Sequence, residues 1–224
     1  MISVAFTHAE ARTAEVSVVI DVLRATSTIV QALAAGYKRV LCVDRLERAR
    51  TLRAPGRILA GERGCRRPPG FHLGNSPSGT LSPLGDELIL ATTNGAPAIV
   101  KSAVLSPRVL VACLLNLDAV VSALPGGDIQ IVCSGTDGHP ALEDTYVAGR
   151  IVERLVGRRT DAALIAEAVA AAYPHGRDAL AASAGARALT LVGLEQDVDD
   201  CALDSTLDIV PRVVEINDGI AIIA

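Results

Sequence analysis

The chain has 224 residues and a net charge of −4, with 50% hydrophobic and only 2% aromatic residues. A core of alanine, valine, leucine and isoleucine is expected, in a chain long enough for one good-sized domain. The acidic balance is unsuited to a protein that follows a phosphate backbone, and the scarcity of aromatic rings argues against binding of single strands, so no nucleic-acid partner is expected.

In chain order, the first predicted elements are a strand at 16–21, a helix at 24–36, a strand at 39–44, a short helix at 45–54 and a strand at 57–62, followed by a long loop from 63 to about 83. The middle of the chain is predicted to form a strand at 86–95 that ends in a polar turn, a helix at 96–105, a strand at 108–116, a short helix at 117–125 and a strand at 128–135. The last predicted elements are a helix at 141–157, two alanine-rich helices near 160–172 and 176–193, and one or two strands within 208–224.

This alternation of strands and helices predicts an α/β fold whose largely parallel sheet is covered on both faces. The tail is expected to add antiparallel edge strands, which makes the sheet mixed. No linker is long enough to separate two independent domains, so residues 1–224 are expected to form a single domain of one or two lobes.

No membrane partner and no secretion are expected. The sequence has no run of about 18 apolar residues, and its first residues, MISVAFTHAEAR, lack the basic region and long apolar stretch of a signal peptide. The five cysteines show no C-x-x-C spacing, which argues against a disulfide framework or a structural zinc site. We therefore expect a cytoplasmic protein in which Cys42, Cys113 and Cys133 are core residues.

The segment from Gly70 to Pro77, GFHLGNSP, has a composition that no amphipathic element needs. A backbone that exposes N–H groups to an anion does need such a composition. Just upstream, GERGCRR offers Glu62 as a metal ligand and Arg63 as an anion contact. This long loop therefore has the character of a polar binding site.

Four predicted strands end in polar clusters, and ligands of open α/β sheets bind beyond the carboxyl ends of the strands. The clusters are Asp21 with Arg24, Glu62 with Arg63, Thr92 to Gly95, and Ser134 to Gly138 followed by Glu143 and Asp144. If the strands are parallel, these carboxylates would surround a hard cation such as Mg²⁺, and the arginines and helix N-termini would hold an anion. This layout is usual for phosphoryl transfer.

Each cluster also has a purely structural interpretation. Asp21 would cap the helix that follows it, Glu143 and Asp144 suit a first helical turn, and Asn94-Gly95 is a common turn pair. The P-loop and dinucleotide-binding signatures are both absent. From the residues alone, the prediction is an α/β enzyme with a metal-and-anion site of unfamiliar pattern.

Segments spread over nearly the whole chain resemble, in this order, the 2-phosphosulfolactate phosphatase family. They are IDVLRATSTIVQAL (20–33), GERG (61–64), GFHLGNSP (70–77), TTNGAPA (92–98), IVCSG (131–135), ALEDTYVAG (141–149) and DIVP (208–211). The resemblance implies a three-layer α/β/α fold. It also implies a Mg²⁺-dependent phosphatase that acts on (R)-2-phospho-3-sulfolactate, a step towards coenzyme M.

The resemblance also points to individual site residues, and our hypothesis for their roles is a direct attack by metal-activated water on phosphorus, without a covalent intermediate. The residues implied to bind Mg²⁺ and to orient water are Asp21, Glu62, Glu143 and Asp144. The residues implied to contact the substrate are Arg24, Asn75, Ser76, Thr93, Asn94 and Gly95, with Arg24 also in the catalytic set. The polar clusters themselves add Arg63 and Gly135 as candidate substrate contacts. The family pattern has a glycine where Cys65 stands and an acid where His72 stands, and these departures bear on the substrate more than on the fold.

Two other functional classes remain open. One is a non-catalytic anion- or metabolite-binding protein, and the other is a Mg²⁺-dependent lyase or isomerase of hydroxy acids on the same scaffold. Release of phosphate from a small anionic phosphorylated substrate separates the phosphatase from both. A homodimer is the working hypothesis for the assembly.

Overall fold

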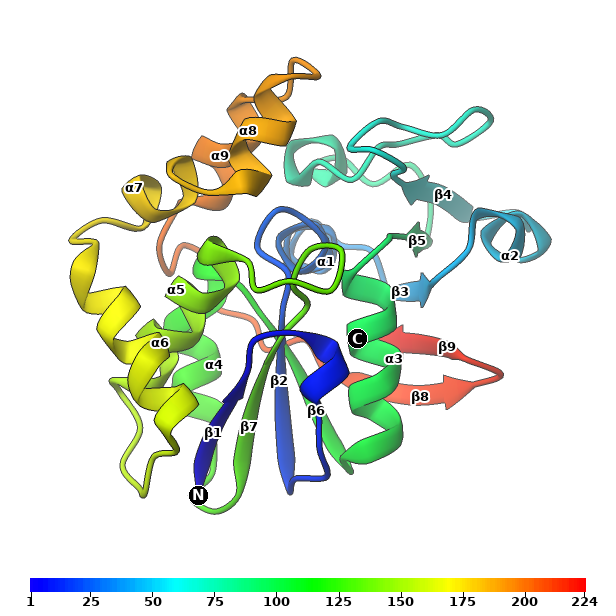
Figure 1. Cartoon of the computed structure of the whole chain (residues 1–224). Helices are drawn as coiled ribbons and strands as arrows, with labels where there is room; N and C mark the ends of the chain where they lie inside the picture. The colour runs from blue at the N-terminus through cyan, green and yellow to red at the C-terminus, as the bar shows by residue number, and fades with distance from the viewer.

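The computed structural model describes residues 1–224, and its strands form two sheets (Figure 1). The first sheet has four parallel strands in the order β1-β7-β2-β6. Their bounds are β1 (Ile2–Ala5), β2 (Val16–Ile20), β6 (Arg108–Ala112) and β7 (Ile129–Cys133). Strand β1 was not predicted, because four residues are too short a run to show a period.

The second sheet has five strands in the order β4-β5-β3-β9-β8. The parallel strands are β3 (Arg39–Val43), β4 (Arg57–Gly61) and β5 (Glu87–Ala91), and the antiparallel ones are β8 (Val213–Asn217) and β9 (Ile220–Ile223). The Val111 N–H donates to the Pro211 carbonyl over 2.9 Å, which links the two sheets between β6 and the start of β8. The expected α/β fold, largely parallel with antiparallel strands from the tail, is confirmed.

Nine α-helices surround the sheets. They are α1 (Ala25–Ala35), α2 (Leu46–Thr51), α3 (Gly95–Leu105), α4 (Leu117–Ala123), α5 (Leu142–Val152), α6 (Asp161–Ala172), α7 (Gly176–Ala181), α8 (Ala184–Thr190) and α9 (Gln196–Cys201). Short 3₁₀ helices occupy His8–Glu10, Pro77–Thr80 and Leu114–Asn116. None of the helices has the length and apolar character that crossing a membrane requires.

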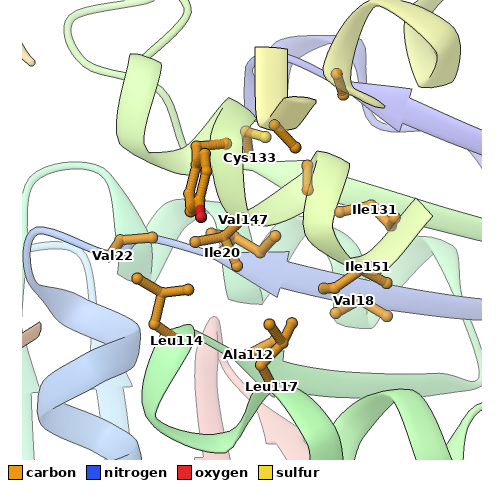
Figure 2. Packing of buried hydrophobic residues seen from close by; sticks show 14 of the residues in the cluster. Val18, Ile20, Val22, Ala112, Leu114, Leu117, Ile131, Cys133, Val147 and Ile151 are labelled. Atoms are coloured by element: carbon orange, nitrogen blue, oxygen red, sulfur yellow. The ribbon is translucent and has the colours of Figure 1, made fainter. Parts of the chain in front are cut away.

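The core follows the two-residue period of the strands. In β2, Val18 and Ile20 face a cluster shared with Val147 and Ile151 of α5, as Figure 2 shows. Val19 faces the opposite way, into a second cluster shared with α1, α3 and the second sheet. A third cluster packs the far face of the second sheet against α2. Helices therefore cover both faces of the strands, as α/β/α layering requires.

The cysteines expected in the core are there. Cys42, Cys113 and Cys133 are all free and buried, with at most 1% of their surface exposed. Each packs as a small apolar side chain among the strand residues.

The helical region after β7 differs most from the prediction. Helix α5 ends at Val152, because residues 158–160 turn back to hydrogen-bond with Ile2 of the unpredicted β1. The predicted helix at 176–193 is two helices, and Ser183 starts the second by accepting a hydrogen bond from the Ala186 N–H over 3.0 Å. Helix α9 was not predicted at all.

Replacement of Gly149 by alanine is expected to destabilise the fold. Gly149 lies where α5 crosses α6, and a Cβ there would stand 2.0 Å from the Ala166 carbonyl oxygen. Separating two packed helices costs about 1–3 kcal/mol or more. Urea denaturation measures this loss. The control is Gly126→Ala, at an open position with a negative φ, for which a change within about 0.5 kcal/mol is expected. Equal midpoints for the two variants would contradict the close helix crossing.

Candidate functional site

A cavity of about 420 Å³ lies beyond the carboxyl ends of the parallel strands. Its lining comes from the segments after β2, β4, β5 and β7, and from α8. Figure 1 shows α7, α8 and α9 grouped at the end of the molecule toward which β2 and β7 run. The four polar clusters of the sequence thus meet at one place, although the strands that carry them belong to two sheets.

Three helices begin at this cavity, namely α1, α3 and α5. The Ala25 N–H at the start of α1 donates to Asp21 Oδ1 over 3.1 Å, and the Ala96 N–H of α3 donates to Thr92 Oγ1 over 2.9 Å. Asp21 therefore acts partly as the cap that its structural interpretation anticipated. The positive ends of three helix dipoles favour negative charge in the cavity.

Asp144 has both carboxylate oxygens occupied by hydrogen-bond donors. Oδ1 accepts from the Val22 N–H over 2.9 Å, and Oδ2 accepts from Ser134 Oγ over 3.1 Å and from the Gly135 N–H over 3.2 Å. These bonds join α5 to the ends of β2 and β7. Burial, followed by the negative charge of Asp21, raises the pKa of Asp144 well above its usual value.

Asp21 and Glu143 differ from Asp144 in having free oxygen atoms. Asp21 Oδ2 and both oxygens of Glu143 have no well-formed hydrogen bond, although Ser134 lies near Asp21 and Ser183 near Glu143, and both residues line the cavity. Burial raises the pKa of Asp21 from 3.8 to about 6. Burial, followed by the charge of Asp21, raises the pKa of Glu143 as well. Burial therefore disfavours the charged form of both carboxylates.

Glu62 ties the loop after β4 to the loop after β5. Its Oε1 accepts from the Thr93 N–H over 2.9 Å and from Thr93 Oγ1 over 2.8 Å, and its Oε2 accepts from the Cys65 N–H over 3.3 Å. Glu62 and Thr93 both line the cavity, and their mutual bonds fix this side of it.

The guanidinium of Arg24 lies at the edge of the cavity and is largely occupied by protein groups. Its Nη1 donates to Asp197 Oδ2 over 2.5 Å and to Ser76 Oγ over 3.1 Å, and its Nη2 donates to the Cys65 carbonyl over 2.9 Å. Three of the five N–H bonds of the guanidinium are thereby used, and two remain for a ligand.

The other predicted site residues divide into two groups. Asn75, Asn94 and Gly135 line the cavity, whereas Ser76, Gly95 and Arg63 do not.

Gly95 lies directly behind Asp21, where a Cβ would stand 2.5 Å from the Ala25 Cβ and 2.6 Å from Asp21 Oδ2. Only a glycine lets α3 start this close to the carboxylate. Arg63 turns away from the cavity and donates to the carbonyls of Glu62 and Asp44 over 2.7 and 2.8 Å. The structure therefore does not bring Arg63 to the ligand side of its loop.

The two departures from the family pattern have local structural effects. Cys65 has a φ of 64°, a conformation that favours glycine and that costs a side chain some strain. His72 Nδ1 accepts a hydrogen bond from the Leu59 N–H over 2.9 Å, and this bond holds the loop against β4. An acid at position 72 would offer an acceptor for the same bond.

Two contributors to the site were missed in the sequence. Helix α8 supplies a wall of small residues that includes Ala184, Gly185 and Ala188, and a Cβ on Gly185 would stand 2.3 Å from Glu143 Oε1. Asp197 of α9 holds Arg24 from behind. No local sequence pattern predicts the role of α8 or of Asp197, because both contact residues that are far away in the sequence.

The charged side chains that line the cavity are five acids and one arginine. They are Asp21, Glu62, Asp137, Glu143, Asp144 and Arg24. No three histidine, cysteine, aspartate or glutamate side chains lie close enough together to form a complete metal site. Mg²⁺ usually takes only one or two carboxylates and keeps several waters. The all-oxygen donor set, with two free and poorly stabilised carboxylates, therefore fits this ion.

Sequence comparisons identify relatives of the chain. A sequence model of the family described as 2-phosphosulpholactate phosphatase matches residues 2–215. A protein of Thermotoga petrophila is 40% identical over 212 residues, covering 92% of this chain and 90% of its own length. A Deinococcus radiodurans protein is 38% identical over 217 residues, covering 91% of this chain and 90% of its own length. Both are named "Probable 2-phosphosulfolactate phosphatase".

Proposed function

Because the chain belongs to the 2-phosphosulfolactate phosphatase family, we propose that it is a Mg²⁺-dependent phosphatase of 2-phosphosulfolactate or of a related phosphorylated 2-hydroxy acid. The observation that supports this proposal most is the pair of free carboxylates, Asp21 and Glu143, in a cavity where three helices begin. Burial and repulsion from neighbouring carboxylates raise their pKa values, although Arg24 lies at the cavity edge, so extra positive charge would stabilise their charged forms. A divalent cation would supply that charge.

Asp21 is the residue best placed to hold Mg²⁺. Its Oδ1 is fixed by the Ala25 N–H, and its Oδ2 is free of hydrogen bonds. The bound ion would neutralise charge on the phosphoryl oxygens and lower the pKa of water. Asp144 and Glu62 would keep their structural bonds and hold the loops in place.

Glu143 is proposed to orient the attacking water and to accept its proton. Burial and the charge of Asp21 raise the pKa of Glu143, which makes this carboxylate a better proton acceptor. A bond then forms between the water oxygen and phosphorus, and the ester P–O bond breaks. The proton goes to the departing hydroxy acid, and the products are inorganic phosphate and a 2-hydroxy acid.

The substrate's negative charge would be met by neutral donors and by helix ends. Asn75 and Asn94 line the cavity, and Arg24 retains two N–H bonds without a protein partner. The N-termini of α1, α3 and α5 add their partial positive charges.

Release of inorganic phosphate tests the proposal directly. With Mg²⁺, the protein is expected to release phosphate from 2-phosphosulfolactate or 2-phospholactate faster than from a simple aryl phosphate, and EDTA is expected to abolish release until Mg²⁺ is restored. The assay is a colorimetric phosphate determination over a panel of 2-phospho-hydroxy acids. Release that is unaffected by EDTA would contradict the metal dependence. Binding of the substrates without any release would indicate the non-catalytic alternative.

A further inference from the structure

Asp197 lies outside the cavity but binds two residues at its edge. Its Oδ2 accepts from Arg24 Nη1 over 2.5 Å and from Ser76 Oγ over 2.7 Å. Both side chains of the ion pair are buried, with 2% of Arg24 and 5% of Asp197 exposed. A single carboxylate of α9 thus connects the start of α1 with the loop that follows β4.

The same loop is held from its other side by α1. Thr28 Oγ1 donates to the Asn75 carbonyl over 2.9 Å, next to Ser76, which contacts both Arg24 and Asp197. The backbone at Asn75 is therefore fixed on both sides by buried polar contacts.

The side chain of Asn75 makes no hydrogen bond of its own. The residue lines the cavity with only 4% of its surface exposed, and its buried Oδ1 has no partner. Buried polar groups normally have a partner, so a free amide at a cavity wall points to a ligand contact. An anion would be met by the N–H bonds of this amide, whereas Oδ1, an acceptor, would need a donor from the ligand or from water. The amide's position depends on Ser76, and through Ser76 on Asp197.

We propose that Asp197 is a positioning residue for substrate binding. It holds Ser76 and Arg24 so that the Asn75 amide and the free N–H groups of Arg24 face the anionic group of the substrate. This inference rests on the proposed phosphatase function. It adds to that function a residue that never touches the substrate and that acts on affinity more than on the chemical step.

The test is Asp197→Asn, which keeps the side-chain volume and one acceptor oxygen but removes the charge. We expect the KM for the best phosphorylated substrate, and the Kd of inorganic phosphate measured calorimetrically with Mg²⁺, to rise about tenfold. The kcat should stay within about threefold, because Asp21 and Glu143 are untouched. Asp197→Ala is expected to have a larger effect in the same direction.

Asp199→Asn is the matched control. Asp199 lies on the same helix and forms an ion pair with Arg177 over 2.7 Å, but both side chains are exposed, at 44% and 63%. This variant should leave the KM, the kcat and the Kd of phosphate unchanged. Thermal unfolding of all variants shows whether they are folded.

A double-mutant cycle with Asn75→Ala separates positioning from a general loss of structure. If Asp197 acts through Asn75 as well as through Arg24, the loss of phosphate affinity in the double variant should be smaller than the sum of the two single losses. Additive losses, an unchanged KM, or a fall in kcat with constant KM would each overturn the inference. Failure of the parent protein to release phosphate would instead count against the proposed function.

Discussion

Asp21→Asn is expected to reduce phosphate release about a thousandfold, because a bound metal ion supplies several kcal/mol of transition-state stabilisation and each step of about 1.4 kcal/mol is tenfold in rate. Asparagine keeps the hydrogen bond from the Ala25 N–H but removes the negative charge at Oδ2. The proposed Mg²⁺ ligand is lost, and the shape of the cavity is kept. Initial rates at saturating Mg²⁺ measure the effect.

The same variant should be more stable than the parent when Mg²⁺ is absent. Burial raises the pKa of Asp21 from 3.8 to about 6, so the folded state binds its proton more tightly than the unfolded state does. The stability that this group contributes is present below about pH 4 and is lost as the pH rises through 6. Above pH 7, Asp21→Asn should therefore exceed the parent by about 1–3 kcal/mol, with no such advantage at pH 4. Urea midpoints with EDTA at both pH values measure this difference.

Asp86→Asn is the control for Asp21→Asn. Asp86 precedes β5 at the opposite end of the strands and pairs with Lys38 over 3.1 Å in an exposed position. Its replacement should leave phosphate release unchanged. A fully active Asp21→Asn protein would contradict the assignment of this carboxylate.

Arg24→Met is expected to reduce the free energy of unfolding by about 3–5 kcal/mol. The substitution fills a similar volume but leaves Asp197 as a buried carboxylate without its cation. Ser76 alone cannot compensate for the lost charge. Chemical denaturation measures the loss, and the double variant Arg24→Met with Asp197→Leu should recover most of it, because removal of both charges leaves neither unpaired.

Arg177→Met provides the comparison for that loss. It removes the exposed partner of Asp199, and exposed ion pairs contribute only about 0–1 kcal/mol. Similar losses for Arg24→Met and Arg177→Met would show that burial of the Arg24–Asp197 pair does not govern its contribution.

The meeting of Asp21, Glu143 and Asp144 could be anticipated from the sequence. Each follows an apolar strand or starts a helix, and parallel strands bring such positions to one edge. The division into two sheets could not be anticipated, because local periodicity says nothing about which strands become neighbours. The cavity depends on both sheets nonetheless.

Arg24 and Arg63 show where prediction from the sequence fails for side chains. Both were candidate anion contacts, and both follow strands of the kind that carry ligands. The orientation of Arg24 is fixed by its bond to the Asp197 carboxylate, 173 residues away, and that of Arg63 by its bond to the Asp44 carbonyl. Orientation depends on partners that sequence spacing does not reveal, and so the composition of the site was easier to predict than its hydrogen bonds.

The distance of 173 residues between Arg24 and Asp197 has a consequence for synthesis on the ribosome. While the earlier strands and helices are emerging, the guanidinium at the start of α1 has no carboxylate to pair with. Its burial must wait until α9 has been translated. One edge of strand β3 stays unpaired even longer during synthesis, because its partner there is β9, which pairs with it through Ala221 to Ile223. A nascent chain can therefore form its first sheet before the Arg24–Asp197 pair can form, and a ribosome that stalls before α9 would hold a chain in which the guanidinium of Arg24 lacks its carboxylate partner.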